Sequence, residues 1–260
     1  MADIQTEIDK LVNKIRNAPI PEKVLTSQAP EPKPVCPRCN GLGFLRRDLP
    51  REDPEFGKLI PCNCSAEQIY GEHSGLSLNE IRMLTWAHIL DHGEALKARQ
   101  AVQRTIERGY GWVYLWGGPG VAKTLLLKIA VAETIKKHKP AGYVGMSALL
   151  DNLREAYDVD QHTQIEAGRR LKRWASIPML AIDEFDKVKD TDFVHEKRMR
   201  LLDDRYEAAV KRQSVTLIAS NLSPEVFEDY LADRIRDGRF EIVELTTDSL
   251  RPAMDWAHDL

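Results

Sequence analysis

The sequence predicts an α/β protein in which a parallel sheet is flanked by helices. From about residue 78, short apolar segments alternate with longer helical ones, a pattern typical of parallel strands joined by helices. A glycine-rich loop connects one of these strands directly to a helix. The 260 residues are 43% hydrophobic and 30% charged, which suffices for one full domain and a small appendage. The strands are expected at 112–116, 143–146, 178–182, 215–219 and 240–245.

Three smaller parts are expected to precede a main domain at 76–260. Residues 1–17 place their aliphatic side chains on one helical stripe, which would pack either on this chain's own domain or on another protein. Residues 18–35 contain five prolines and predict a semi-rigid linker. Residues 36–75 hold every cysteine of the chain and are expected to form a metal-binding module.

The cysteines are arranged as two close pairs. Cys36 and Cys39 form a C-x-x-C pair, and 22 residues separate it from the C-x-C pair of Cys62 and Cys64. This spacing favours a structural zinc site with four thiolate ligands and no open coordination position. Free thiols and disulfides are the alternatives, and His73 is an outside candidate for replacing one ligand.

The segment WVYLWGGPGVAKTLLL at 112–127 places a strand, a glycine turn and a helix in succession. This order is the one required of a phosphate-binding loop, whose pattern G-x-x-x-x-G-K-[ST] is matched except that Ala122 replaces the last glycine. Lys123 would reach the phosphates, and the Thr124 hydroxyl would hold magnesium. The residues expected to bind ATP are Gly117, Gly118, Pro119, Gly120, Val121, Ala122, Lys123, Thr124, Leu125 and Asp183.

A second acidic motif follows the loop by about 60 residues. Four apolar residues end in Asp183 and Glu184, which would bind magnesium and activate the attacking water, respectively. The next strand ends before Asn221, whose amide would polarise the γ-phosphate or the lytic water. Capping of a helix at 223–225 is an equally good explanation of this asparagine.

Composition excludes some classes of protein. The net charge of −3 gives no overall attraction to nucleic acid or membrane, so any such surface must be local. No apolar run reaches the ~20 residues of a membrane span, and the acidic N-terminus lacks a signal-peptide core. We therefore expect a cytoplasmic protein.

With these motifs in place, residues 78–255 resemble AAA+ ATPases of the DnaC/IstB type, the replicative helicase loaders and their transposition relatives. The resemblance assigns an arginine finger to Arg234 and a sensor-2 arginine to Arg251. MoxR-like AAA+ proteins resemble this chain in carrying alanine at the position of Ala122. Only 39 residues follow Asn221, which implies the truncated lid of the DnaC-like branch.

The resemblance implies an ATPase that loads a replicative helicase onto single-stranded DNA. The N-terminal module would hold the hexameric helicase, the protomers would self-associate as a ring or spiral, and the basic helix at about 162–175 would contact DNA. In that helix, a solvated basic face is the alternative, and Trp174 is expected to belong to the core. The alternatives for the whole protein are an IstB-like ATPase that assists a transposase and a non-hydrolysing nucleotide-binding adaptor.

Overall fold

The computed structural model describes residues 35–53, 56–157, 161–189 and 191–246. The helix expected at 1–17 and all but the last residue of the linker lie outside the described residues. The contacts divide the chain into two compact units, Met1–Gly41 and Leu42–Leu260. The described part of the first unit is a turn in which the backbone N–H of Asn40 donates to the carbonyl of Cys36.

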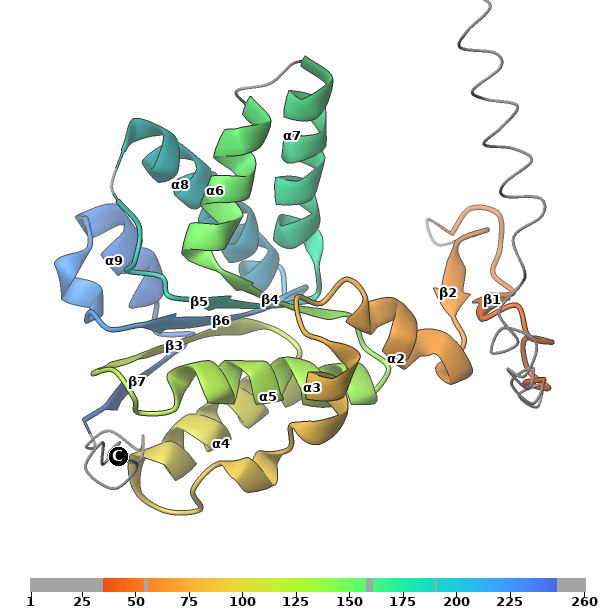
Figure 1. The fold of residues 1–260 in the computed structure, drawn as a ribbon, viewed down its shortest axis with the longest axis horizontal. Helices are drawn as coiled ribbons and strands as arrows, with labels where there is room; N and C mark the ends of the chain where they lie inside the picture. The colour runs from red at the N-terminus through yellow and green to blue at the C-terminus, as the bar shows by residue number, and fades with distance from the viewer. Residues whose placement is uncertain (1–34, 54–55, 158–160, 190, 247–260) are drawn as a thin grey trace, which may run out of the picture. The chain divides into compact units, whose positions relative to one another are not determined.

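The second unit contains the helices and strands of the fold, drawn in Figure 1. Its strands are β1 (Phe44–Arg46), β2 (Leu59–Pro61), β3 (Gly111–Gly117), β4 (Ala141–Gly145), β5 (Met179–Asp183), β6 (Val215–Ser220) and β7 (Glu241–Leu245). Its α-helices are α2 (Asn63–Gly71), α3 (Leu78–Met83), α4 (Gly93–Arg108), α5 (Lys123–Lys136), α6 (Met146–Tyr157), α7 (Gln161–Ser176), α8 (Asp192–Val210) and α9 (Asp229–Ile235). Two short 3₁₀ helices, η2 (Trp86–His88) and η3 (Pro224–Val226), complete the series.

The central sheet has five strands in the order β4-β5-β6-β3-β7. Every pair of neighbours in it is parallel, which confirms the predicted α/β class and the five predicted strands. β1 and β2 form a separate antiparallel pair. Because all five strands run the same way, their carboxyl ends lie along one edge, where ligands bind in open α/β sheets.

Both faces of the sheet are covered by helices. Val113 and Leu115 of β3 are buried with α4 and α5 on one face, whereas Trp112 and Tyr114 are buried with α6 and α8 on the other. Successive residues of a strand point to opposite faces, so a strand covered on both sides needs an unbroken apolar run. The sequence WVYLW in β3 is such a run.

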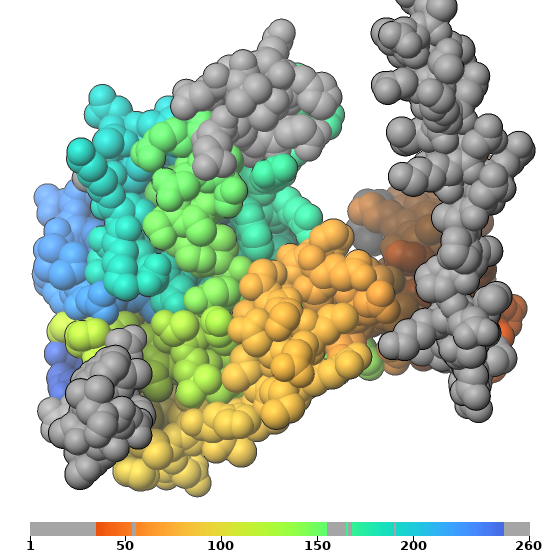
Figure 2. All heavy atoms as spheres, viewed as in Figure 1, coloured from red at the N-terminus to blue at the C-terminus, as the bar shows by residue number. Residues whose placement is uncertain are grey.

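Helix α3 begins with a capping box. The Ser77 hydroxyl accepts from the backbone N–H of Glu80, and the Glu80 carboxylate accepts from that of Ser77. The segment before it lies against β4, because the N–H of Tyr143 donates to the Ser74 carbonyl over 2.6 Å. A Cβ on Gly75, where φ is +80°, would lie 2.0 Å from the Tyr143 carbonyl oxygen. The space-filling view shows α3 against α5 on one face of the molecule (Figure 2).

Replacing Glu80 by glutamine is expected to reduce the loss in free energy of unfolding at acidic pH. The Lys128 ammonium, 2.9 Å away, and Ser77 together lower the pKa of Glu80 from 4.5 to about 2. A carboxyl whose pKa falls on folding stabilises the fold above the unfolded value, and this contribution is lost as the pH falls through the folded value. The stability that Glu80 contributes is therefore lost as the pH falls from 4.5 to about 2. Urea titrations across it should show a larger loss for the wild type than for Glu80→Gln, whereas Glu107→Gln, an exposed carboxylate of α4, should behave as the wild type does.

One arginine is buried completely within the domain. Arg205 of α8 has no exposed surface, and its Nε donates to the Thr216 hydroxyl over 3.0 Å. Its Nη atoms donate to the carbonyls of Ala175, Ile177 and Val215, so the guanidinium joins α8 to β6 and to the end of α7. Burial lowers the pKa of Arg205 to about 9, which leaves it charged at pH 7.

Candidate nucleotide-binding site and cysteine cluster

The loop between β3 and α5 has the backbone geometry of a tight glycine turn. Gly117 has a φ of +145°, and a Cβ there would lie 2.0 Å from the carbonyl oxygen of Leu245 on the neighbouring strand. Gly120 has a φ of +86°. Side chains at these positions would clash or be strained, so glycine is required for the chain to turn from β3 into α5.

The departure at Ala122 occurs at a strained position. This residue precedes α5 with a φ of +66°, in the left-handed region that glycine adopts freely and alanine does not. A glycine at this position, as in the usual pattern, would adopt the same conformation without strain. The alanine therefore keeps the shape of the loop at a cost in free energy.

Replacing Ala122 by glycine is expected to raise the free energy of unfolding by about 0.5–1 kcal/mol, because the strain is released. Nucleotide affinity should be equal or higher. Chemical denaturation measures the first effect, and titration with a fluorescent ATP analogue measures the second. The matched control is Ala208→Gly within α8, which should lower stability by about 1 kcal/mol. A loss of stability in both variants would contradict the strain argument.

Lys123 is the first residue of α5, and its side chain lies against the backbone of the glycine loop. Its Nζ donates to the carbonyls of Gly117 and Gly118 over 2.6 and 2.7 Å and to the Asn221 side chain over 3.1 Å. The residue is 8% exposed, and burial lowers the pKa of its ammonium. Opposing this shift are the negative charges of Asp186 and Asp183, so the site concentrates charge of both signs.

Asp183 ends β5 and is held in a fixed orientation. One carboxylate oxygen accepts from the Tyr143 hydroxyl over 2.7 Å, and the other accepts from the backbone N–H of Glu184 over 2.9 Å. Burial and the hydrogen bond to Asp183 raise the pKa of Tyr143, which keeps its hydroxyl a donor. Thr124, in the first turn of α5, has an exposed side chain and lines a pocket together with Asp183. A carboxylate and a hydroxyl of this kind are suitable magnesium ligands.

Glu184 adopts a positive φ of 51°, which is uncommon for a residue with a side chain. This conformation turns the chain after β5 and places Glu184 at the pocket lining. Its carboxylate accepts from Lys187 over 2.8 Å, and the carboxylate raises the pKa of that lysine. Non-glycine residues held in such conformations occur often at functional sites.

Asn221 is positioned by an aspartate that the sequence analysis missed. Asp186 accepts from the backbone N–H of Asn221 over 2.8 Å and from its side-chain Nδ2 over 3.0 Å. The Oδ1 of the same amide faces Lys123. The asparagine therefore does not cap η3, whose first residue follows Ser223 without a side-chain cap. The only sequence signal for Asp186 is its place three residues after Asp183.

These side chains surround one pocket of about 520 Å³ at the carboxyl edge of the sheet. Its lining residues are Pro119, Gly120, Ala122, Lys123, Thr124, Leu125, Lys128, Asp183, Glu184, Asp186, Lys187, Ala219, Ser220 and Asn221. The predicted residues Gly117, Gly118 and Val121 shape the loop without lining this pocket. Lys128, Asp186 and Lys187 are charged lining residues that the sequence analysis did not identify.

Arg234, the predicted arginine finger, is not among the residues that line this pocket. Arg234 lies in α9, where its guanidinium is stacked on the rings of Tyr206 and Tyr230 at 4.4 and 4.3 Å. It also forms an ion pair of 3.1 Å with Asp203. The structure thus gives Arg234 no contact with the nucleotide pocket of its own chain. Arg251 lies outside the described residues.

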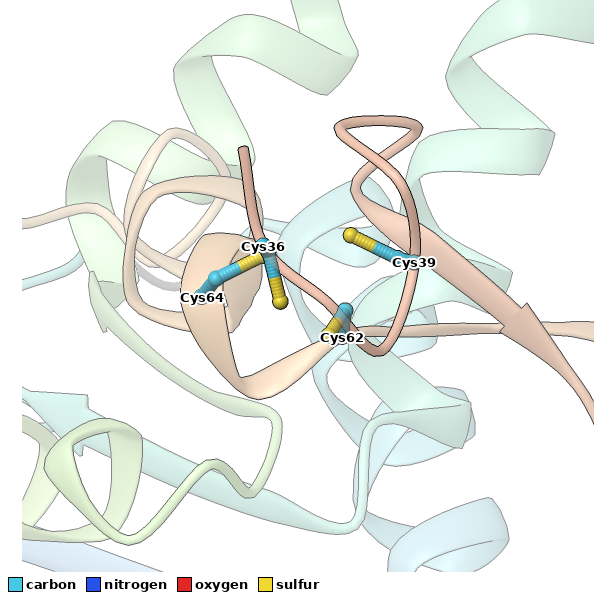
Figure 3. A group of neighbouring side chains, drawn as sticks. All are labelled: Cys36, Cys39, Cys62 and Cys64. Atoms are coloured by element: carbon cyan, nitrogen blue, oxygen red, sulfur yellow. The ribbon is translucent and has the colours of Figure 1, made fainter. Parts of the chain in front are cut away.

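The four cysteine thiols lie close together (Figure 3). The sulfur atoms of Cys36, Cys39, Cys62 and Cys64 are all within 4.8 Å of one another, and none forms a disulfide. Thiolates around a tetrahedral zinc ion at ~2.3 Å would be about 3.8 Å apart, so a small contraction would close the cluster on a metal. The cluster is thus consistent with the predicted four-thiolate module.

The basic residues of α7 are exposed. Arg169, Arg170, Lys172 and Arg173 face solvent, whereas Trp174 is half-buried against the core between the sheet and α8. Trp174 therefore belongs to the core, as expected. Separately, none of the helices in the described part of the chain is long and apolar enough to cross a membrane.

Comparisons with known proteins give similarity at the level of structure. No protein-family model and no curated protein matches the chain. AMPPCP-bound DnaA from Aquifex aeolicus is 18% identical, with a TM-score of 0.55 over 64% of this chain and 50% of that one. DnaA bound to AMPPCP and single-stranded DNA is 18% identical, with a TM-score of 0.53 over 64% and 52%. DnaI is 18% identical, with a TM-score of 0.54 over 72% of this chain and 100% of that one.

The chain spans about half the length of the DnaA structures and matches DnaI over that protein's full solved length. The chain therefore has the α/β fold that these DnaA and DnaI structures share.

Proposed function

We propose that this chain is an ATPase that loads a replicative helicase onto single-stranded DNA. The observation that carries the ATPase part is the convergence of Lys123, Asp183 and Asn221, from three different elements, on one pocket beside a glycine loop. A cation, a magnesium-binding carboxylate and a positioned amide are the groups that phosphoryl transfer to water requires. The likeness to DnaI over most of this chain supports the choice of a loader.

Each group has a role in the proposed reaction. Backbone N–H groups of the loop and the Lys123 ammonium would hold the β- and γ-phosphates, and magnesium would bind between Thr124 and Asp183. Glu184 would accept a proton from the attacking water, and Asn221, fixed by Asp186, would orient the γ-phosphate or that water. Magnesium supplies charge neutralisation when bound.

The two arginines would complete the site between protomers. Arg234 of one protomer would reach the nucleotide of the next in a ring or spiral, which is compatible with its separation from its own pocket. To do so it would exchange the Asp203 carboxylate for a phosphate. Arg251 would act as a second sensor of the γ-phosphate. ATP binding would thereby favour assembly, and hydrolysis would reset it.

The parts before residue 76 would hold the helicase, and α7 would contact DNA. The expected helix at 1–17 and the expected cysteine module at 36–75 would extend beyond a minimal ATPase domain, and IstB-type proteins generally lack such a module. This difference favours a helicase over a transposase as the partner. On α7, four exposed cations within five positions suit a phosphate backbone.

Extraction of the metal tests the cysteine module. Purified under reducing conditions, the protein should contain about one zinc per chain, and Cys39→Ser should lose most of it, because Cys39 is a buried member of the cluster. Removal of zinc by a chelator should lower the thermal midpoint of the module and leave ATP affinity within about twofold. Asn63→Ala, an exposed residue between the last two cysteines, is the control. A wild-type zinc content near zero would reject the site.

The loader function is tested with the full chain and two purified candidates, a hexameric replicative helicase and a transposase from the same host. Complex formation with the helicase that depends on ATP, and unwinding that depends on this protein, would support the proposal. Binding of the transposase alone would favour the IstB-like alternative. ATP binding without turnover in every assembly would favour a nucleotide-binding adaptor.

A further inference from the structure

A second pocket lies at the edge of the sheet opposite the nucleotide site. It is formed where β3, β6 and β7 begin, and it has a volume of about 350 Å³. Three arginines line it, Arg108 at the end of α4, Arg212 after α8 and Arg239 before β7, together with the rings of Tyr110 and Phe240. Because the strands are parallel, their beginnings and their carboxyl ends lie at opposite edges of the sheet. The second pocket and the nucleotide site therefore share no lining residue.

Two of these arginines share one aromatic ring. The guanidinium carbons of Arg108 and Arg212 lie 4.9 and 5.3 Å from the centroid of Tyr110. Arg108 is further held by its Nε, which donates to the Tyr110 carbonyl over 3.0 Å. No carboxylate among the residues that the structure describes forms an ion pair with either of them. Arg239 differs, since it is paired with Asp237 and hydrogen-bonded to Tyr206.

Helix ends explain only part of this arrangement. Cations are favoured near helix C-termini, which accounts for a basic residue at the end of α4 and of α8. It does not account for their convergence, because like charges brought to one ring repel. Arg212 also has a φ of +60°, at a position after a helix where glycine is preferred. An arginine kept in a strained conformation, beside a second arginine that likewise has no ion pair within the described part of the chain, indicates that its charge is used.

We propose that this pocket binds a phosphate group of a single-stranded nucleic acid. Guanidinium groups bind phosphate oxygens in pairs, which lysine does not, and the three cations here are all arginine. Aromatic rings between cations are typical of surfaces that bind a strand rather than a free anion. The choice of DNA as the strand rests on the proposed function; the phosphate site itself does not. The pocket would hold the strand at a point separate from α7.

The test is binding of the full-length protein to a fluorescent single-stranded oligonucleotide, followed by anisotropy at several salt concentrations. Arg108→Gln and Arg212→Gln should each weaken binding about threefold to tenfold and reduce the slope of log K against log salt by about 1. Lys211→Gln is the matched control. It removes one positive charge at the position before Arg212, and this lysine is paired with Glu207 over 3.1 Å. Equal binding by Arg212→Gln and Lys211→Gln would overturn the proposal.

A further variant and two competitors make the result specific. Arg212→Gly should raise the thermal midpoint, because glycine fits the positive φ, while it weakens binding as Arg212→Gln does. Displacement of the oligonucleotide by low-millimolar inorganic phosphate would assign the pocket to a free anion and overturn the strand. If the arginine variants bind an acidic peptide more weakly but bind the oligonucleotide as the wild type does, the pocket belongs to a protein partner. This result would also overturn the proposal.

The outcome can be separated from that of the proposed function. ATP turnover in the absence of DNA should be unchanged in the pocket variants, since the two pockets share no residue. Arg170→Gln on α7 tests the other DNA contact independently. If Glu184→Gln leaves turnover unchanged but Arg212→Gln still loses DNA, the ATPase proposal fails and the phosphate site stands.

Discussion

Replacing Glu184 by glutamine is expected to slow ATP turnover by about 10²- to 10³-fold while ATP affinity stays within about threefold of the wild type. Glutamine has nearly the same shape and cannot accept a proton from the attacking water. The loop contacts and the Lys123 hydrogen bonds do not involve Glu184, so binding should persist. A steady-state phosphate-release assay and equilibrium binding of an ATP analogue measure the two effects.

The position of Glu184 allows a sharp control. Its carboxylate accepts from Lys187, so the substitution also removes an ion pair at an exposed site, which is worth little for stability. Lys187→Gln breaks the same pair and leaves the carboxylate in place. It should change turnover far less than Glu184→Gln does. Equal losses in the two variants would assign the effect to the ion pair and not to a general base.

The sequence predicted the sheet because its strands are covered on both faces. Such strands must be nearly continuous apolar runs, and β3, β5 and β6 are fully or almost fully buried. The order of the strands was not predictable from these runs. It depends on which strands pair, and a run such as that of β3 fits either neighbour equally well.

The site residues that were not predicted are those that contact a residue from another part of the fold. Asp186 bonds to Asn221 between the turns that follow β5 and β6, and Tyr143 of β4 bonds to Asp183 of β5, across 35 and 40 residues of sequence. A motif records residues close in sequence, whereas these partners become close only when the sheet forms. The same is true of Lys128, which reaches Glu80 from α5. Sequence motifs thus located the groups proposed to touch the nucleotide, and the structure supplied those that orient them.

Replacing Arg205 by alanine is expected to lower the free energy of unfolding by about 4 kcal/mol or more. The substitution leaves a cavity and removes the donor from the buried Thr216 hydroxyl and from three carbonyls, of which those of Ala175 and Val215 are buried. Each buried polar group left without a partner costs about 1–3 kcal/mol, and the cavity adds to this. Urea-induced unfolding measures the difference. Arg200→Ala removes an exposed arginine from the same helix and should cost less than about 0.5 kcal/mol.

Two further substitutions separate the packing of Arg205 from its hydrogen bonds. Arg205→Met restores most of the volume but none of the donors, so it should recover only the cavity part of the loss. Arg205→Lys keeps a charge but cannot direct three nitrogen atoms at Thr216, Ala175 and Val215 together, and it leaves a strongly hydrated ammonium buried. Lysine should therefore be no better than methionine, although it is the conservative change. A lysine variant as stable as the wild type would mean that charge alone, and not the planar fork, holds α8 to the sheet.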